Sequence, residues 1–125
     1  MAEERREPAI RVILMPRDTN SAGIVFGGVI LSYLDQAGAV AARRLYDRKF
    51  VTVAMREVEF LSPVLVGDLV SFYAEAIRTG RTSVTVQVTV EAHRDLPGTP
   101  RIQVTTAEVV YVAVGPDGRP VPLVG

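Results

Sequence analysis

The pattern of apolar and polar positions predicts one long helix within a chain that otherwise forms strands. Between Gly28 and about Asp47 there is no proline, and apolar residues recur with the 3.6-residue period of a helix. On a helical wheel they form one broad arc: Val29, Ile30, Tyr33, Leu34, Ala37, Val40, Ala41 and Leu45. The opposite, polar sector is narrow and holds Ser32, Gln36 and Arg43. We therefore expect other parts of the protein to cover most of this helix.

Elsewhere apolar and polar residues alternate with the period of two that is typical of strands. The clearest strand spans residues 82–92, and its apolar positions all point to one face: Val84, Val86, Val88, Val90 and Ala92. Four more strands are predicted at residues 10–15, 50–61, 69–78 and 101–114. Residues 79–81 are expected to close a hairpin, and residues 95–100 to form another turn.

The order of these elements predicts an α+β fold, with one long helix against a mostly antiparallel sheet. We expect a single domain over residues 1–125, with a loose N-terminus at 1–8 and a C-terminal tail at 115–125. One helix can cover only part of one sheet face. The long, valine-rich strands therefore predict association with a second copy, through sheet edges or sheet faces.

Composition excludes several kinds of chemistry. The chain has no cysteine, which excludes disulfides, thiol catalysis and thiolate metal sites, and its one histidine, His93, excludes a multi-histidine metal site. Lys+Arg and Asp+Glu both number 14, so charge gives no reason to expect nucleic acid or a membrane surface as partner. No signal-like apolar run follows the N-terminus, and no apolar run is long enough to span a bilayer. We expect a soluble cytoplasmic protein.

The candidate chemistry lies along the predicted helix. Asp35 falls at the margin of the apolar arc, where an acid must be paired, ligated or in use. The helix starts after Phe26 and Gly27, without a polar N-cap residue, so its first amides lack an obvious partner. Two interpretations stay open. Free amides and a carboxylate would form an oxyanion site and a base. Alternatively, the glycines fit a tight corner and Asp35 bonds a neighbouring strand.

The segment from residue 15 to 44, MPRDTNSAGIVFGGVILSYLDQAGAVAARR, resembles the acyl-CoA thioesterases of the hotdog fold. It is most similar to the bacterial and cytosolic acyl-CoA hydrolase group, which includes the brain-type enzyme. VTVA at 51–54, FLSPVLVGD at 60–68 and GRTSVTVQV at 80–88 agree in order, so the resemblance covers residues 9–114. It implies a central helix wrapped by a curved five-stranded sheet. It also implies a homodimer with interfacial active sites that assembles further into a tetramer or hexamer.

Carried onto this chain, the resemblance assigns the catalytic acid to Asp35 and the catalytic asparagine to Asn20. The amide that binds the thioester carbonyl falls on Gly28, with Gly27 beside it, and a polar residue of the next strand falls on Thr52. Asp35 would act as a general base or as a nucleophile, and the residues do not decide between these roles. Asn20 precedes Asp35 by 15 residues (35 − 20), so the two can belong to different protomers.

Arg81, with Gly80 and Ser83, would meet the phosphates of coenzyme A if the hairpin turn reaches the mouth of the site; the alternative is a solvated arginine in a turn. His93 is expected at a strand end on the surface. Arg56-Glu57 depart from the family pattern and predict an altered wall beside the site. Coenzyme A is part of the substrate, and we expect neither a separate cofactor nor a metal.

The implied activity is hydrolysis of acyl-CoA to a free carboxylic acid and coenzyme A. A hotdog dehydratase or hydratase is a weaker alternative, since that chemistry uses a histidine near the helix and His93 lies in a late strand. An alternative from a different class is a non-catalytic domain that binds or senses acyl-CoA. Release of free thiol from an acyl-CoA distinguishes an enzyme from a binding domain.

Overall fold

The computed structural model describes residues 6–94 and 98–125 and contains the predicted elements in the predicted order. Their bounds, in chain order, are β1 (Ile10–Ile13), the 3₁₀ helix η2 (Pro16–Asp18), α1 (Gly27–Leu45), β2 (Lys49–Phe60), β3 (Leu69–Thr79), β4 (Ser83–His93) and β5 (Ile102–Val114). The ends of the helix and strands lie within two residues of the predicted ones. The predicted turn at 95–100 falls partly outside the described residues.

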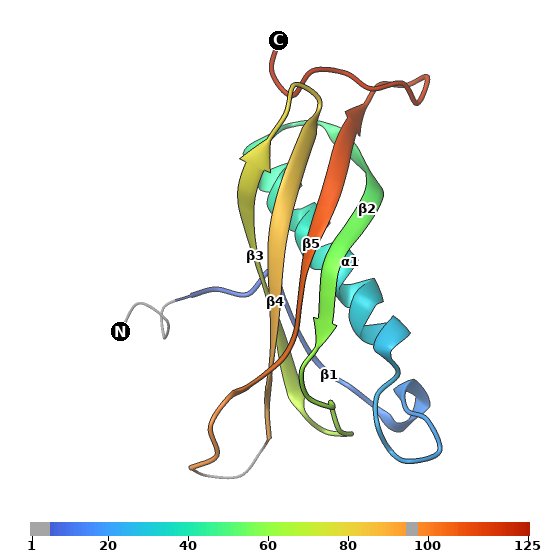
Figure 1. Ribbon diagram of the computed structural model, residues 1–125, viewed down its shortest axis with the longest axis vertical. Coiled ribbons are helices and arrows are strands. Elements are labelled where there is room, and N and C mark those ends of the chain that lie inside the picture. Colours follow the sequence, from blue (N-terminus) through green and yellow to red (C-terminus); the bar gives the residue numbers. More distant parts are fainter. Residues whose placement is uncertain (1–5, 95–97) are drawn as a thin grey trace.

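The five strands form one antiparallel sheet in the order β1-β3-β4-β5-β2. Figure 1 shows the long strands running the length of the molecule, with α1 lying along one face of the sheet. The predicted α+β fold is therefore confirmed. Both β1 and β2 are edge strands, and among the described strands each pairs with a single neighbour.

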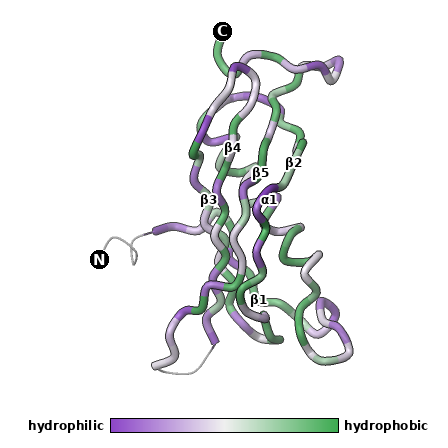
Figure 2. The backbone as a smooth tube through the Cα atoms, in the orientation of Figure 1, coloured by the Kyte–Doolittle hydropathy of each residue, from purple (hydrophilic) through white to green (hydrophobic). Residues whose placement is uncertain are grey.

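The core lies between α1 and the sheet. All five apolar positions predicted for one face of β4 are fully buried: Val84, Val86, Val88, Val90 and Ala92. Hydrophobic and hydrophilic stretches alternate along the strands, as the period of two requires (Figure 2). From α1, Ile30, Leu34, Ala37 and Ala42 enter this core. Leu45 was expected to be buried with them but is 58% exposed, because it is the last residue of the helix and no further turn covers it.

Strand β2 is irregular, which the alternation in the sequence did not predict. Its pairing with β5 shifts register between Thr52 and Ala54, and again between Arg56 and Glu59. Glu57, with φ of 53°, is the one non-glycine residue with positive φ among the described residues, and it lies in the second of these bulges. Bulges bend a strand and increase its twist. Beside α1, β2 therefore departs from a straight strand.

The loop between β2 and β3 is held in place by a buried carboxylate. Asp68 is 2% exposed, and its Oδ2 accepts a hydrogen bond from the backbone N–H of Leu65 at 2.9 Å. Arg94 pairs with the same oxygen at 3.4 Å and donates to the backbone oxygen of Pro63. Gly67, with φ of 86°, supplies the left-handed turn between Leu65 and Asp68. This loop therefore has a defined position opposite the start of α1.

The two ends of the molecule carry different features (Figure 1). At one end lie the start of α1 and the β2–β3 loop. At the other, the C-terminal tail folds onto the β3–β4 hairpin, where the N–H of Leu123 donates to the oxygen of Arg81 at 2.9 Å. Arg48, just after α1, donates to the oxygen of Pro122 in the same tail. None of the helices in the described parts of the chain is long and apolar enough to cross a membrane.

Candidate active site

The first turn of α1 has backbone donors without partners. The N-cap residue is Phe26, and it makes no side-chain capping bond, as the sequence predicted. The N–H groups of Val29 and Ile30 both reach the oxygen of Phe26, at 3.0 and 3.4 Å. Within residues 6–94 and 98–125, the N–H groups of Gly27 and Gly28 donate to no acceptor. Because the helix dipole is positive at this end, these amides favour a developing negative charge.

The two glycines differ in what requires them. A Cβ on Gly27 would lie 3.2 Å from the ring of Phe60, so a side chain there would press on this exposed ring. A Cβ on Gly28 would meet no atom within 4 Å, and its φ is not positive. Glycine within a helix destabilises it by about 0.5–1 kcal/mol relative to alanine. Nothing among the described residues accounts for that loss, which suits a backbone approached by a group from outside the chain.

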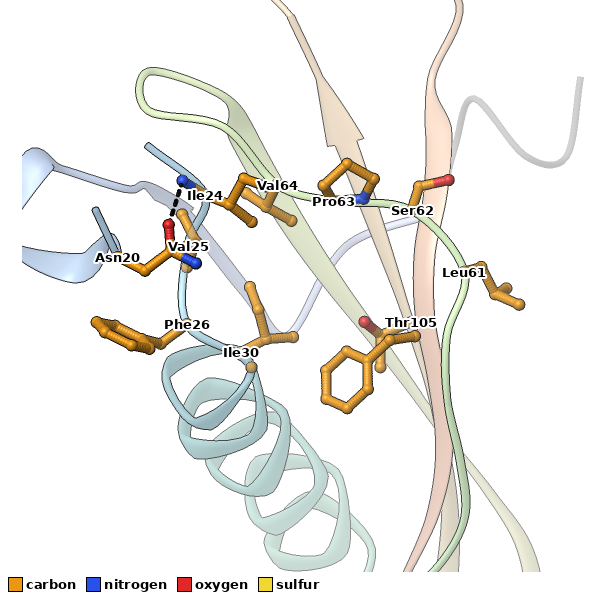
Figure 3. Close-up of a pocket in the computed structure, with 12 residues that line it drawn as sticks. Asn20, Ile24, Val25, Phe26, Ile30, Leu61, Ser62, Pro63, Val64 and Thr105 are labelled. Atoms are coloured by element: carbon orange, nitrogen blue, oxygen red, sulfur yellow. Dashed lines mark hydrogen bonds between the residues drawn. The ribbon is translucent and has the colours of Figure 1, made fainter. Parts of the chain in front are cut away.

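A cavity of about 410 Å³ opens beside this helix start, between the loop that precedes α1 and the β2–β3 loop. Figure 3 shows the side chains around it, which are mostly apolar. They are Asn20, Ile24, Val25, Phe26, Gly27, Ile30, Phe60, Leu61, Ser62, Pro63, Val64 and Thr105. An apolar cavity with few polar groups suits an acyl chain whose polar end is fixed at one point.

Asn20 is a polar group of this cavity, and its two amide atoms have different roles. Its Oδ1 accepts hydrogen bonds from the backbone N–H groups of Ala22, at 2.9 Å, and Ile24, at 3.1 Å. Within the described part of the chain, its Nδ2 donates to no acceptor, and Figure 3 shows it on the cavity side. An asparagine side chain can bind a ligand through either end of its amide. The fold leaves only the NH₂ donor.

Asp35 lies further along α1 and is half-buried. Its Oδ1 accepts a hydrogen bond from Thr52 Oγ1 at 2.7 Å and lies 3.1 Å from the hydroxyl of Tyr111. That hydroxyl also lies 2.6 Å from the main-chain oxygen of Asp35. No hydrogen bond from the described residues reaches Oδ2. The acid is thus bonded to neighbouring strands, as one of the two interpretations of the sequence predicted. Its second oxygen, Oδ2, nevertheless stays available.

Tyr111 and Gly38 complete the surroundings of Asp35, and the sequence analysis did not single them out. Burial, followed by the charge of Asp35 and the hydrogen bond to it, raises the pKa of Tyr111 above its usual value, while the Ala39 backbone N–H opposes this. The hydroxyl therefore stays protonated and donates. A Cβ on Gly38 would overlap this hydroxyl. A glycine inside a helix was the available signal, since such a residue usually has a packing reason.

The structure brings some predicted site residues together and separates others. Thr52 contacts Asp35, whereas Asn20 and Gly27 line the cavity at the helix start. Asp35 follows Gly28 by seven residues (35 − 28), which is about 10 Å along a helix. Within one chain, therefore, the carboxylate and the free amides do not meet at one point.

The hairpin residues lie elsewhere. The β3–β4 turn, which contains Gly80, Arg81 and Ser83, lies at the end of the molecule opposite the start of α1 (Figure 1). The N–H of Gly80 donates to the oxygen of Ser83 at 2.8 Å, and a Cβ on Gly80 would approach Ser83 Oγ at 2.7 Å. These two residues therefore form the turn itself. Arg81 is exposed. No group of three or more His, Cys, Asp and Glu side chains in the described part of the chain is arranged to hold a metal ion.

Free amides at a helix start, an amide donor and a carboxylate with one available oxygen are the groups used to hydrolyse an acyl bond. On an antiparallel sheet packed against one long helix, they define a thioesterase of the hotdog class. The chain belongs to the Thioesterase superfamily, whose family model matches residues 22–97.

Among individual proteins, the chain is 40% identical over 119 residues to the acyl-CoA thioester hydrolase YciA of Salmonella typhimurium, covering 94% of this chain and 90% of the relative. Solved structures agree. A hexameric hotdog fold thioesterase of Campylobacter jejuni matches with a TM-score of 0.87 and 46% identity, covering 94% of this chain and 90% of that one. The hexameric thioesterase y2039 of Yersinia pestis matches with a TM-score of 0.89 and 37% identity, covering 97% and 98%. The resemblance to hotdog thioesterases is confirmed.

Proposed function

We propose that this protein hydrolyses acyl-CoA thioesters to a free carboxylic acid and coenzyme A. The observation that carries the proposal is the state of Asp35, whose Oδ1 is held by a hydroxyl of a neighbouring strand while Oδ2 is available. A carboxylate in that state suits a general base or a nucleophile. The relatives with about 40% identity, which are acyl-CoA thioester hydrolases, support the substrate class.

In the proposed reaction the thioester carbonyl lies at the start of α1. Its oxygen accepts a hydrogen bond from the N–H of Gly28, with Gly27 beside it, and these donors stabilise the negative charge that forms on attack. Removing one such donor typically costs about 3–4 kcal/mol of transition-state stabilisation. Asn20 donates through Nδ2. Water that Oδ2 deprotonates attacks the carbonyl carbon, the carbon–sulfur bond breaks, and the free acid and the coenzyme A thiolate are released. Alternatively, Oδ2 attacks directly and expels the thiolate, and water then hydrolyses the resulting acyl anhydride to release the acid and restore Asp35.

We further propose that two protomers share each site. A reacting carbonyl must lie about 3 Å from its donors and its base, whereas Gly28 and Asp35 of one chain are about 10 Å apart along α1. A second copy would place its helix start beside Asp35. The unpaired edge of β2, next to Thr52, exposes Val51 (41%) and Val53 (55%) and suits edge-to-edge pairing. The hexameric relatives support further assembly of such dimers into a hexamer.

The coenzyme A moiety would then extend away from the shared carbonyl position. Arg81, with Gly80 and Ser83, remains our candidate for its phosphates, but only in a site to which another protomer contributes, because this turn and the start of α1 lie at opposite ends of one protomer (Figure 1). Arg81→Ala would raise KM for acyl-CoA with little change in kcat if this contact forms.

The test is thiol release from a panel of acyl-CoAs with short, medium, long and aromatic acyl groups. We expect the wild-type protein to release thiol and Asp35→Asn to lose nearly all turnover while keeping its oligomeric state. Wild-type turnover in Asp35→Asn would remove Asp35 from the mechanism. Binding of acyl-CoA without thiol release from any member of the panel would instead establish the non-catalytic binding domain.

Mixed oligomers test the shared site. Asn20→Asp keeps the oxygen that the loop needs and removes the NH₂ donor, so this variant and Asp35→Asn should each be inactive alone. Equal amounts refolded together should recover about a quarter of wild-type activity, because half of randomly paired dimers are mixed and one of their two sites is intact. No recovery, in mixtures whose size-exclusion profile matches the wild type, would contradict a site shared in this way.

A further inference from the structure

We propose that Tyr111 is a positioning residue for Asp35, and that Gly38 is a glycine because it must admit the Tyr111 hydroxyl. The proposal rests on the proposed function, since it assumes that Asp35 is the reacting acid. Tyr111 would not touch the substrate. Its role would be to hold one carboxylate oxygen so that the other faces the thioester.

The register of the sheet sets up this arrangement. Thr52 on β2 and Tyr111 on β5 are directly paired, so both side chains leave the sheet on the same face, toward α1. Their hydroxyls lie 2.7 and 3.1 Å from the same oxygen, Asp35 Oδ1. The bulge between Thr52 and Ala54 shifts the register of β2 against β5 only for the residues after this pair. Two neighbouring strands thus present two hydroxyls to one carboxylate oxygen.

The Tyr111 hydroxyl also ties the side chain of Asp35 to its backbone. It lies 2.6 Å from the main-chain oxygen of Asp35 as well as near Oδ1, so its single proton is shared between two acceptors of the same residue. With Thr52 donating to Oδ1 at the same time, rotation of the carboxylate would break a hydrogen bond. A carboxylate without these contacts would exchange its two oxygens freely. Held in this way, Oδ2 is the oxygen available to react.

Packing indicates that the contact is built in. Tyr111 is 1% exposed, so its ring is enclosed by other parts of the protein. A Cβ on Gly38 would overlap the hydroxyl and approach ring atoms at 2.9 and 3.0 Å. Gly38 lies one turn after Asp35 on α1, on the same side of the helix. A glycine inside a helix lowers helix stability relative to alanine, and here it leaves room for a buried hydroxyl.

The experiment compares Tyr111→Phe with the matched control Tyr73→Phe. Tyr73 is also buried, but it lies on β3, and its hydroxyl accepts a hydrogen bond from Arg11 at 3.4 Å, away from Asp35. We expect Tyr111→Phe to lower kcat about tenfold to a hundredfold, the range for losing a hydrogen bond to a charged group. KM should change less than about twofold, because the substrate does not touch Tyr111. Tyr73→Phe should leave both values unchanged.

Gly38→Ala is a second route to the same test, because it displaces the hydroxyl while keeping the tyrosine. Its loss in kcat should not add to that of Tyr111→Phe in the double variant, since both changes remove one contact. Wild-type kcat in Tyr111→Phe would overturn the inference and leave the proposed function intact. Equal losses in Tyr111→Phe and Tyr73→Phe would also overturn it. Wild-type turnover in Asp35→Asn would remove Asp35 from the mechanism and overturn this inference with it, while acyl-CoA hydrolysis itself would stand.

Discussion

Replacing Gly28 by alanine and replacing Gly38 by alanine should change the stability of the fold in opposite directions. At Gly28 the new methyl group would meet no atom within 4 Å. The change should therefore stabilise the fold by at most about 1 kcal/mol, the difference between alanine and glycine in a helix interior, because Gly28 lies in the first turn. The backbone N–H of Gly28 remains. The methyl group, however, would occupy the space in which we place the thioester carbonyl, so kcat/KM should fall.

At Gly38 the same change meets a packed surface. The methyl carbon would overlap the buried hydroxyl of Tyr111 and lie 2.9 Å from its ring carbon Cζ. Overpacking of this kind costs about 1–3 kcal/mol, and the gain in helix propensity offsets only part of it. A net destabilisation of up to about 2 kcal/mol follows.

Thermal unfolding followed by circular dichroism measures both effects. For 125 residues, the entropy of unfolding near 60 °C implies a change in Tm of about 4 °C for each kcal/mol. Gly28→Ala should then raise Tm by at most about 4 °C, and Gly38→Ala should lower it by up to about 8 °C. Protomer concentration must be held constant, because assembly adds to apparent stability. Thiol release measured on the same samples reports activity.

The reasoning would be refuted by a lower Tm in Gly28→Ala accompanied by weaker assembly. That result would show that a partner subunit, and not the substrate, fills the space beside this glycine. A higher Tm with unchanged kcat/KM would remove Gly28 from the carbonyl site. For Gly38, a Tm at or above the wild-type value would show that Tyr111 can move aside, and that the close packing described above does not constrain it.

Two further predictions concern Asn20 and Tyr111. Asn20→Ala should lower both Tm and activity. Asn20→Asp keeps the oxygen that orders the loop, so it should lose activity with a smaller change in Tm. Equal losses of Tm in the two variants would show that this oxygen does not order the loop. Folding raises the pKa of Tyr111 above 10, the usual tyrosine value. The neutral phenol therefore contributes fully to the free energy of unfolding below pH 10, and this contribution is lost as the pH rises above 10. Denaturant unfolding between pH 9 and about 11.5 measures how the free energy of unfolding falls with pH. This fall should be steeper in the wild type than in Tyr111→Phe by up to about 1.4 kcal/mol per pH unit. Identical slopes in the two proteins would contradict this.

Local patterns determined most of the fold. The alternation along β4 predicted which residues are buried, and the helical period predicted α1 and the margin position of Asp35. Both follow from the spacing of side chains within one element, which the sequence alone specifies. The missing N-cap before Gly27 was equally visible in the sequence, since capping depends on the residues beside the helix start.

The tertiary structure decided which of the candidate site residues contact one another, and through which atoms. Tyr111 contacts Asp35 across 76 positions of sequence, and no period relates the two. Their contact depends on the register of β5 against β2 and on a bulge that the alternation of residues did not reveal. Gly27 and Gly28 are identical in sequence, yet only Gly27 packs against Phe60. Periodicity reports which face of an element is buried. The identity of the buried partner is set only when distant elements pack together.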